Sequence, residues 1–446
     1  MLVPLLKEFD DRIVGNAELN ESVFGQLTDL QRKLGLVFGD RPTCPFLRPH
    51  VITRRQYDEV ARAAQTIALA IEKVVERALS DNQLLMQLDL TPRETAMARI
   101  DPGYSRLCVT SRLDAYVSDD GFKFLEYNAE SPAGVGDQMQ LEKVLFELAH
   151  MKQLLGERAH WRPEPHKKLL QSMLQAYRER GGDKEYPHVA IVDWKGVSTE
   201  SEFRILQKYF ASEGYPAIIA DPNDLSYSNN QLMAGDFVID IVYKRVVIHE
   251  FLERCAEDHP LAQAYADGRV CMANSFRTKL AHKKAGFAIL TDPGYAHLFT
   301  VDELQTIRHH IPWTRRVIPG TTSFEGAECE LIQLIRRERE QFVLKPNDDY
   351  GGHGVFLGWE TSANDWEDAI VRARERPYVV QQRVPLKKVA MPTFSGGLHL
   401  DEMYIDFNPF LFHNEVEGAL IRLSSSSLLN VTSGGGQTAL LVLEDS

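Results

Sequence analysis

A lysine followed by closely spaced glycines, with a β-like run on each side, most limits how this chain can fold. Residues 345–354 read Lys-Pro-Asn-Asp-Asp-Tyr-Gly-Gly-His-Gly, between the apolar runs 342–344 and 355–357. This order predicts a hairpin and matches neither a Walker A loop nor a dinucleotide fingerprint. Glycines let backbone N–H groups approach phosphate oxygens, and the lysine adds a positive charge. The segment indicates a nucleotide triphosphate site, with an ordinary glycine-rich hairpin as the alternative.

The bulk composition is that of a globular enzyme and excludes several other classes. The 446 residues are 44% hydrophobic and 25% charged, which indicates two or three domains or one large unit. A net charge of −13 at pH 7 argues against a nucleic-acid binder. We expect no membrane partner, because no apolar run is long enough to span a bilayer. The five cysteines lack paired spacing, which argues against zinc or disulfide frameworks and indicates a cytoplasmic protein.

The periodicity of apolar residues predicts a mixed α and β chain. Steps of three and four residues predict a helix over 55–79, and further helices are expected at 138–156 and 166–180. Residues 188–253 are expected to form a small parallel sheet, with strands at 189–192, 217–220 and 237–243 and a helix at 200–210. A further strand is expected at 378–382.

A second hairpin is predicted at 112–128, around the turn 118–121. Alternation along each strand places Arg112 with Asp114, and Glu126 with Asn128, on shared faces. Carboxylate and amide oxygens are ligands that Mg2+ prefers, and an arginine beside them suits a transferring phosphoryl group. The alternative is a solvated face with cross-strand ion pairs.

Together the two hairpins resemble the ATP-grasp enzymes, specifically the circularly permuted group that is similar to glutathionylspermidine synthetase. Ordinary ATP-grasp chains have the phosphate lysines first and the metal strands last. Here Arg112-x-Asp114 and Glu126-Tyr127-Asn128 precede Lys345 and its glycines, which is the permuted order. The resemblance covers about residues 100–446 and includes the runs 192–194 and 404–410.

The resemblance implies a permuted ATP-grasp fold of class α+β / α/β. It divides the chain into an N-terminal helical region at 1–100, a metal-binding hairpin with helices at 101–185, a pre-ATP-grasp α/β domain at 186–265 and an ATP-binding part at 270–446. Substrate specificity is expected from the N-terminal helices, the 186–255 sheet and the loop 395–398.

The resemblance also implies roles for particular residues. For Lys284 the alternatives are that Lys283 is the ligand or that both lysines are solvated helix residues. Strand packing is the alternative for Gln381 and Gln382, and a surface ion pair is the alternative for Arg422. The implied set consists of Asp114, Glu126 and Asn128 as Mg2+ ligands, Arg112, Ser131 and Arg422 at the transferring phosphoryl group, and Lys284, Lys345, Gly351, Gly352, Gly354, Gln381 and Gln382 around ATP.

The implied activity is ATP-dependent ligation of a carboxylate to an amine through an acyl phosphate, with ATP and two Mg2+ ions. The expected partners are a small-molecule or peptide carboxylate and an amine acceptor. Two other functions stay open: a kinase of the same fold that stops at phosphorylation, and a nucleotide-binding protein without turnover. Intact metal-ligand residues argue against the last of these.

Overall fold

The hairpin predicted at 112–128 is confirmed and lies inside the largest sheet. A computed structural model describes residues 2–38, 41–118, 121–156, 158–394, 397–426 and 435–445, so Asp119 and Asp120 of the expected turn and part of the loop 395–398 lie outside the described residues. Strands β4 (Thr110–Ser118) and β5 (Gly121–Asn128) pair antiparallel, with Arg112 opposite Asn128 and Asp114 opposite Glu126. The register therefore brings all four polar residues together.

Strands from the end of the chain complete this central sheet. Its order is β23-β22-β21-β4-β5, and β20 also pairs with β21. Phe410 of β21 lies opposite Arg112 of β4, and Asp406 lies opposite Arg422 of β22. The late strands are β20 (Lys388–Phe394), β21 (Leu398–Phe412), β22 (Glu415–Ser424) and β23 (Gly436–Thr438).

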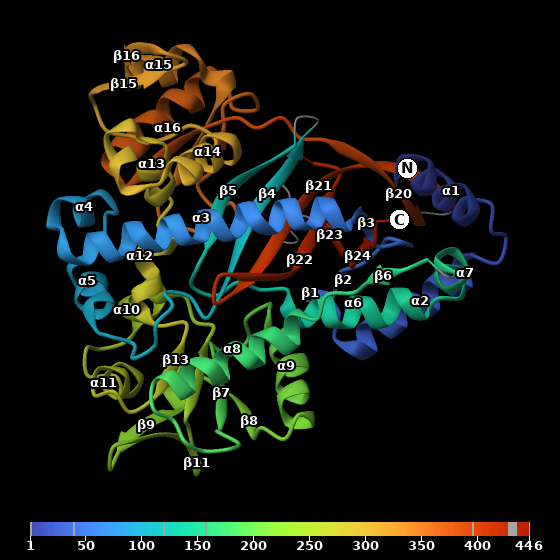
Figure 1. The fold of residues 1–446 in the computed structure, drawn as a ribbon, viewed down its shortest axis with the longest axis horizontal. Helices are drawn as coiled ribbons and strands as arrows, with labels where there is room; N and C mark the ends of the chain where they lie inside the picture. The colour runs from blue at the N-terminus through green and yellow to red at the C-terminus, as the bar shows by residue number, and fades with distance from the viewer. Residues whose placement is uncertain are drawn as a thin grey trace.

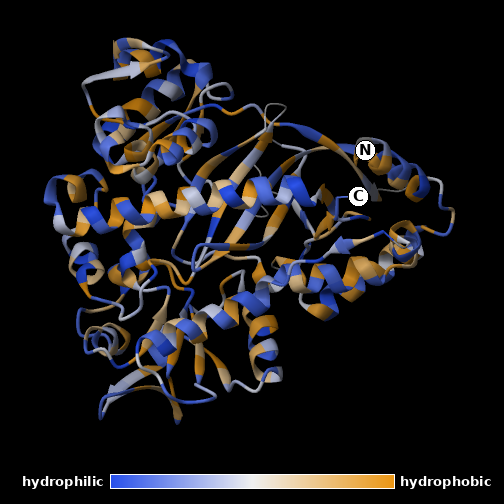
Figure 2. Ribbon diagram, viewed as in Figure 1, coloured by the Kyte–Doolittle hydropathy of each residue, from blue (hydrophilic) through white to orange (hydrophobic). Residues whose placement is uncertain are grey.

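The helix predicted at 55–79 is confirmed as α3 (Arg54–Ser80), which runs across one face of the central sheet (Figure 1). Thr53 begins it with a capping box to Gln56, which satisfies backbone N–H groups of the first turn. Its apolar side chains pack against those of β4 and β5, and Figure 2 shows both hydrophobic and hydrophilic residues along its length. This two-sided character is what its periodicity predicts.

The parallel sheet predicted after residue 188 is also present. Its order is β13-β12-β7-β8, formed by β7 (Val189–Val192), β8 (Ala217–Ala220), β12 (Ile241–Lys244) and β13 (Cys271–Ala273), with α9 (Glu200–Ser212) between β7 and β8. Strand β13 lies beyond the predicted end of this region at 265. The division of the chain into four regions stays a prediction.

The single strand expected at 237–243 is wrong. The segment forms β11 (Phe237–Val238), which pairs with β10 (Gln231–Ala234), and then β12 in the parallel sheet. Asp240 separates the two, because its carboxylate binds Lys184 at 2.8 Å and accepts the His188 backbone N–H at 2.8 Å. Apolar periodicity does not reveal such a local anchor.

The glycine segment 345–354 connects two antiparallel strands, as predicted. Strands β17 (Phe342–Pro346) and β18 (Phe356–Leu357) belong to a sheet of order β14-β19-β17-β18, with β14 (Thr314–Arg316) and β19 (Tyr378–Gln382). Helices α15 (Leu331–Arg337) and α16 (Ala363–Glu375) bury apolar residues against it, including Trp366.

Helices dominate the N-terminal hundred residues, as expected. They are α1 (Leu2–Val14), α2 (Glu21–Leu34), α3, α4 (Asn82–Gln87) and α5 (Pro92–Arg99). Strand β3 (His50–Thr53) pairs with β24 (Leu440–Leu443), which brings the two ends of the chain together (Figure 1). The helices predicted at 138–156 and 166–180 are α6 (Val135–Glu147), α7 (Ala149–Leu155) and α8 (Pro165–Glu179). Within the described ranges, every helix is too short or too polar to cross a membrane.

Asn274 fastens the central sheet to the parallel sheet, and its loss should destabilise the fold. Its buried Oδ1 accepts the Val109 and Thr110 N–H groups at 2.8 and 3.0 Å, and its Nδ2 donates to the Ala129 carbonyl at 2.8 Å.

Each unpaired buried group costs about 1–3 kcal/mol. We expect Asn274→Ala to lower the free energy of unfolding by at least about 3 kcal/mol in urea titrations. Asn16→Ala, which removes one bond to the Glu18 N–H, is the control and should cost about 1 kcal/mol. Equal losses in the two variants would contradict this role.

Candidate active site

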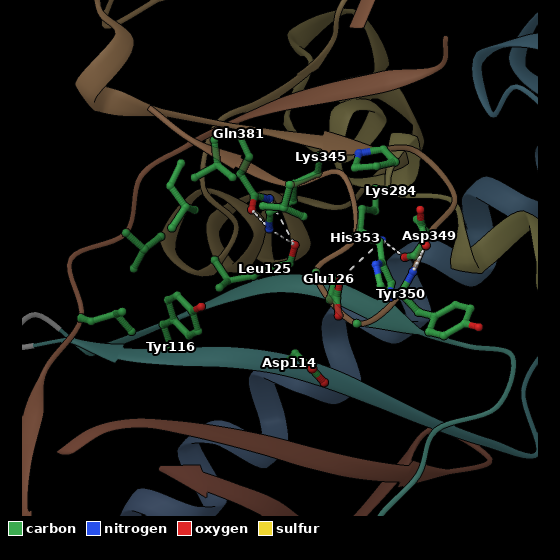
Figure 3. A pocket seen from close by; sticks show the side chains of 18 of the residues that line it. Asp114, Tyr116, Leu125, Glu126, Lys284, Lys345, Asp349, Tyr350, His353 and Gln381 are labelled. Carbon is green, nitrogen blue, oxygen red and sulfur yellow. Dashed lines mark hydrogen bonds and ion pairs between the residues drawn. The ribbon is translucent and has the colours of Figure 1, made fainter. Parts of the chain in front are cut away.

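All but one of the predicted site residues line two adjoining cavities, and the exception, Gly354, lines neither. Nine line a first pocket between β5 and the glycine segment (Figure 3). They are Asp114, Glu126, Lys284, Lys345, Gly351, Gly352, Gln381, Gln382 and Arg422. Arg112, Asn128 and Ser131 line a second cavity, which shares Glu126, Tyr350, Gly351 and Arg422 with the first. The structure thus brings together residues that the sequence separates by more than two hundred positions.

The backbone of the glycine segment adopts left-handed conformations that favour glycine. Gly351, Gly352 and Gly354 have φ of 68°, 80° and 67°. A Cβ at Gly354 would lie 2.9 Å from Pro346 and from the Tyr378 hydroxyl, so this glycine serves the tight return of the hairpin. At the tip, the Tyr350 hydroxyl donates to Glu250 at 2.6 Å, which connects the segment to α10 (Ile248–Arg254).

Lys345 is held in the first pocket by Gln381. Its Nζ donates to Gln381 Oε1 at 2.7 Å and to the Leu125 carbonyl at 3.4 Å (Figure 3). The Gln381 amide in turn donates to the Thr314 hydroxyl at 3.1 Å. Burial lowers the pKa of Lys345 to about 8, against the opposing carboxylate of Glu126. Gln381 therefore positions the lysine, while Gln382 lines the pocket and pairs through its backbone with Trp313 at 2.8 Å.

The adjacent lysines 283 and 284 point to different environments. Lys284 lines the first pocket, where its Nζ donates to the Asp349 carbonyl at 2.8 Å and lies 3.4 Å from Glu126. Lys283 is bound between Glu94 at 3.1 Å and Asp348 at 2.6 Å. This geometry favours Lys284 as the nucleotide contact and gives Lys283 a structural role.

Asp114, Glu126 and Asn128 have the oxygen atoms that a hard cation binds, although arginines already occupy both oxygens of Asp114. Asn128 Nδ2 donates to Glu126 Oε1 at 3.3 Å, so the two side chains are adjacent, and the Asn128 amide would have to turn to present its oxygen to the same cation. Burial raises the pKa of Glu126, but Lys284 and Lys345 outweigh it and lower the value to about 2. Glu126 is thus ionised, as an Mg2+ ligand must be. Both oxygens of Asp114 accept from arginines, so a metal there would share them.

Two arginines lie at the junction of the cavities and bind the same carboxylate. Arg112 is bidentate to Asp114, at 2.7 and 3.0 Å, and Arg422 reaches Asp114 at 2.9 Å. Arg422 also binds the fully buried Asp406, whose other oxygen accepts the Asn408 amide at 2.7 Å. Burial opposes the charge of Arg422, but Asp406 and Asp114 outweigh it and raise its pKa. Both guanidiniums are therefore held in place by carboxylates before any substrate binds.

Sequence reasoning missed several of these partners. Asp406-x-Asn408 repeats the alternating acid and amide of Glu126-x-Asn128, and this signal could have placed it beside the site. Asp348 belongs to the glycine segment but was not singled out. Lys279 lies 2.6 Å from Asp348 and 2.8 Å from Glu130. Glu130, Asp348 and His282 lie close enough together to hold a metal ion, but the Lys279 ammonium already pairs with both carboxylates.

Ser131 lies beside a buried lysine in the second cavity. Lys244 Nζ donates to its hydroxyl at 3.4 Å, and burial lowers the pKa of this lysine to about 8. Lys244 was not predicted, because a lysine at the end of a strand carries no distinctive signal in the sequence.

Comparison with known proteins decides the family. The sequence profile of the family described as "Circularly permuted ATP-grasp type 2" matches residues 49–424. The chain belongs to this family. An uncharacterized protein of Mycobacterium leprae is 24% identical over 445 residues, which cover 91% of this chain and 73% of that protein. A putative glutamate–cysteine ligase 2-2 of Frankia casuarinae is 22% identical over 342 residues, covering 71% of this chain and 36% of that protein.

A solved structure supports the same fold. The apo form of a glutathione synthetase-like effector from Globodera pallida matches with a TM-score of 0.61 and 15% identity, covering 96% of this chain and 99% of that chain. The permuted ATP-grasp fold expected from the sequence is thus confirmed. The narrower similarity to glutathionylspermidine synthetase stays a prediction.

The two adjacent lysines should have separable effects. We expect Lys284→Met to weaken ADP binding about tenfold, because it removes a charge that faces the pocket, and to lower thermal stability less than Lys283→Met, because its partner Glu126 is 31% exposed. Lys283→Met should instead lower the melting temperature, since it breaks buried ion pairs, while ADP affinity changes less than about twofold. Calorimetric titration and thermal unfolding of both variants would measure this. A reversed pattern would assign the nucleotide contact to Lys283.

The pKa of Lys345 predicts that nucleotide affinity depends on pH. The free lysine is charged below about 8 and neutral above it. A bound phosphate requires the charged form, so ADP affinity should be highest near pH 7 and fall about tenfold by about pH 9. In Lys345→Arg the guanidinium stays charged over this range, so the decline should largely disappear. Calorimetry at several pH values tests this, and the same decline in both proteins would assign it to another group.

Proposed function

We propose that this protein is an ATP-dependent ligase that joins a carboxylate to an amine through an acyl phosphate. The observation that carries the proposal is the junction of the two cavities. A pocket with lysines and a glycine hairpin adjoins a second cavity, and Glu126 and Arg422 line both. Such an arrangement suits a reaction in which a nucleotide phosphate meets a second substrate.

Each group of residues has a distinct task in this proposal. Lys345, Lys284 and the backbone N–H groups of the glycine hairpin bind ATP phosphates. Glu126 and Asn128, with Asp114, would hold Mg2+, and two ions are expected from the family resemblance. When bound, Mg2+ neutralises negative charge on phosphate oxygens.

The reaction has two steps at the junction. In the first, a carboxylate oxygen attacks the γ-phosphorus, and the bond to the β-phosphate oxygen breaks with its electron pair, releasing ADP. Arg112 and Arg422 neutralise charge on the transferring phosphoryl group. In the second, an amine nitrogen attacks the acyl carbon and loses a proton, and phosphate leaves with the electrons of the carbon–oxygen bond. The product is an amide.

The relatives support the reaction class at a coarse level. One relative carries the name of a putative glutamate–cysteine ligase, and that reaction type joins a carboxylate to an amine. The proposal therefore extends to a small-molecule or peptide acid and an amine acceptor. Glutathionylspermidine-like chemistry and a cytoplasmic location remain the narrower predictions from the sequence.

An ADP-release assay with a panel of acids and amines tests the proposal. We expect release that requires both an acid and an amine and falls at least about 100-fold in Asn128→Ala, because a metal ligand is lost. Asn364→Ala, at an exposed position of α16, is the matched control and should behave like the wild type.

Two results would contradict a ligase. Release that is independent of amine, with phosphate retained on the acceptor, would identify a kinase. Equal background rates in the wild type and Asn128→Ala across the panel would identify a nucleotide-binding protein without turnover.

A further inference from the structure

The far wall of the second cavity is formed by the ends of two parallel strands. Asp193 and Trp194 follow β7, and Arg245 follows the neighbouring strand β12. The Arg245 backbone N–H donates to the Val192 carbonyl at 2.9 Å, so Arg245 and Asp193 are neighbours across the sheet. In open α/β sheets, ligands bind beyond the carboxyl ends of parallel strands. This wall is therefore placed where a ligand would be expected.

Two buried hydrogen-bond donors on this wall have no acceptor. Among the described residues, Arg245 Nε and Trp194 Nε1 are buried and without a partner. Both residues line the second cavity. An unpaired buried donor costs free energy unless a ligand or water supplies the acceptor. Two such donors on one cavity wall indicate an acceptor group, and a carboxylate has two oxygens to offer.

The charge of Arg245 strengthens this indication. The arginine is 4% exposed and lies between the Phe203 and Tyr243 rings, each 5.4 Å from its Cζ. Its nearest carboxylate oxygen, on Glu202, is 3.7 Å away. Glu202 also accepts the Gly134 and Gly136 backbone N–H groups at 2.8 and 3.2 Å. Arg245 Nη1 donates to the Pro132 carbonyl and the Tyr243 hydroxyl, and among the described residues its Nε has no acceptor, so this charged side chain has a donor left for an anionic ligand.

Asp193 on the same wall offers the opposite charge. Its Oδ1 accepts the backbone N–H of Trp194 at 2.8 Å, and within the described residues it forms no ion pair. The three other acids of the cavity are already engaged: Glu126 with Lys284, Glu130 with Lys279, and Glu250 with the Tyr350 hydroxyl. Burial raises the pKa of Asp193, and a neighbouring ammonium would relieve that cost.

We propose that this wall binds an α-amino-acid head group of the substrate, with its carboxylate on Arg245 and Trp194 and its ammonium on Asp193. The head group would lie away from the bond being formed, because Arg112 and Arg422 mark the reacting end of the same cavity. The substrate class is then an amino acid or peptide with a free head group and a second reactive group. The assignment rests on the proposed function only for which end reacts; the head-group site stands on its own contacts.

Binding measured by calorimetry, without turnover, tests this site. The probes are L-glutamate, γ-glutamylcysteine and glutathione, each with a free head group, together with glutarate, which lacks the ammonium, and 4-aminobutyrate, which lacks the α-carboxylate. Titrations are made without nucleotide and again with ADP and Mg2+. We expect at least one head-group probe to bind the wild type. We expect L-glutamate to bind about tenfold more tightly than glutarate or 4-aminobutyrate, each of which lacks one charged group of the head.

Two conservative variants separate the two halves of the site. Trp194→Phe keeps the ring and removes the donor, so glutarate and the head-group probes should weaken about tenfold while 4-aminobutyrate is unchanged. Asp193→Asn should weaken the head-group probes and 4-aminobutyrate and leave glutarate unchanged. Trp161→Phe is the matched control, because Arg54 covers the Trp161 ring at 4.5 Å as Arg254 covers Trp194 at 5.0 Å. This control should bind all probes as the wild type does.

The outcomes distinguish this proposal from the ligase proposal. If no head-group probe binds in either condition, or if Trp194→Phe and Asp193→Asn bind as Trp161→Phe does, the head-group site is wrong. If binding responds to the variants as expected but no acid and amine support ADP release, the site stands and the ligase proposal fails. Amide formation with normal affinities in all variants would retain the ligase and overturn the site.

Discussion

The buried carboxylate of Asp114, shared by Arg112 and Arg422, is the interaction on which the central sheet and the site both depend. It connects β4 to β22, two strands about three hundred residues apart in the sequence, and Asp406 extends the network through the strand between them. Removing one partner of a buried ion pair leaves an uncompensated charge that costs about 3–5 kcal/mol. The late strands can therefore join the early hairpin only in the register that pairs these groups. Strands that are far apart in the permuted sequence thereby form one sheet, and their polar side chains lie on one face of it.

A second constraint is that the lysines in and beside the first pocket are surrounded by internal acceptors. Lys284 lies near Glu126, Lys345 is held by Gln381, and Lys279 and Lys283 bind Asp348 at the start of the glycine segment. Buried ammonium groups without such partners would lose their protons. The internal acceptors orient the lysines in advance, so an incoming phosphate meets charges that are already in place. This preorganisation reduces the entropy lost on binding.

Local sequence patterns predicted the parts of the fold that depend on short-range order. Alternation identified the face that carries Arg112, Asp114, Glu126 and Asn128, and the position of the glycines identified the hairpin after Lys345. Apolar periodicity failed at Asp240, where a polar side chain binds two groups from another segment and ends the strand pairing. Partners that depend on pairing between distant strands were equally invisible.

The same limit applies inside the site. Gln381 could be placed on its strand, yet its contact with Lys345 requires the register of β17 against β19. The difference between Lys283 and Lys284 depends on which neighbour faces Glu94, and a sequence of two adjacent lysines does not contain that information. Trp194 and Arg245 become a pair only because β7 and β12 end side by side. Spatial convergence, which decides function, is a property of strand order and not of local pattern.

The shared boundary of the two cavities also bears on how the reaction could avoid water. Tyr350 and Gly351 line both cavities, and the Tyr350 hydroxyl is bound to Glu250 of the parallel-sheet region. In the proposed reaction, the segment that would cover the phosphates is therefore also a wall for the second substrate. A ligand that stabilises this position from one side stabilises it for the ligand on the other side, because coupling between two binding sites is reciprocal. An acyl phosphate formed at this boundary would be protected as long as both cavities are filled, and the Tyr350–Glu250 contact supplies the physical connection between them.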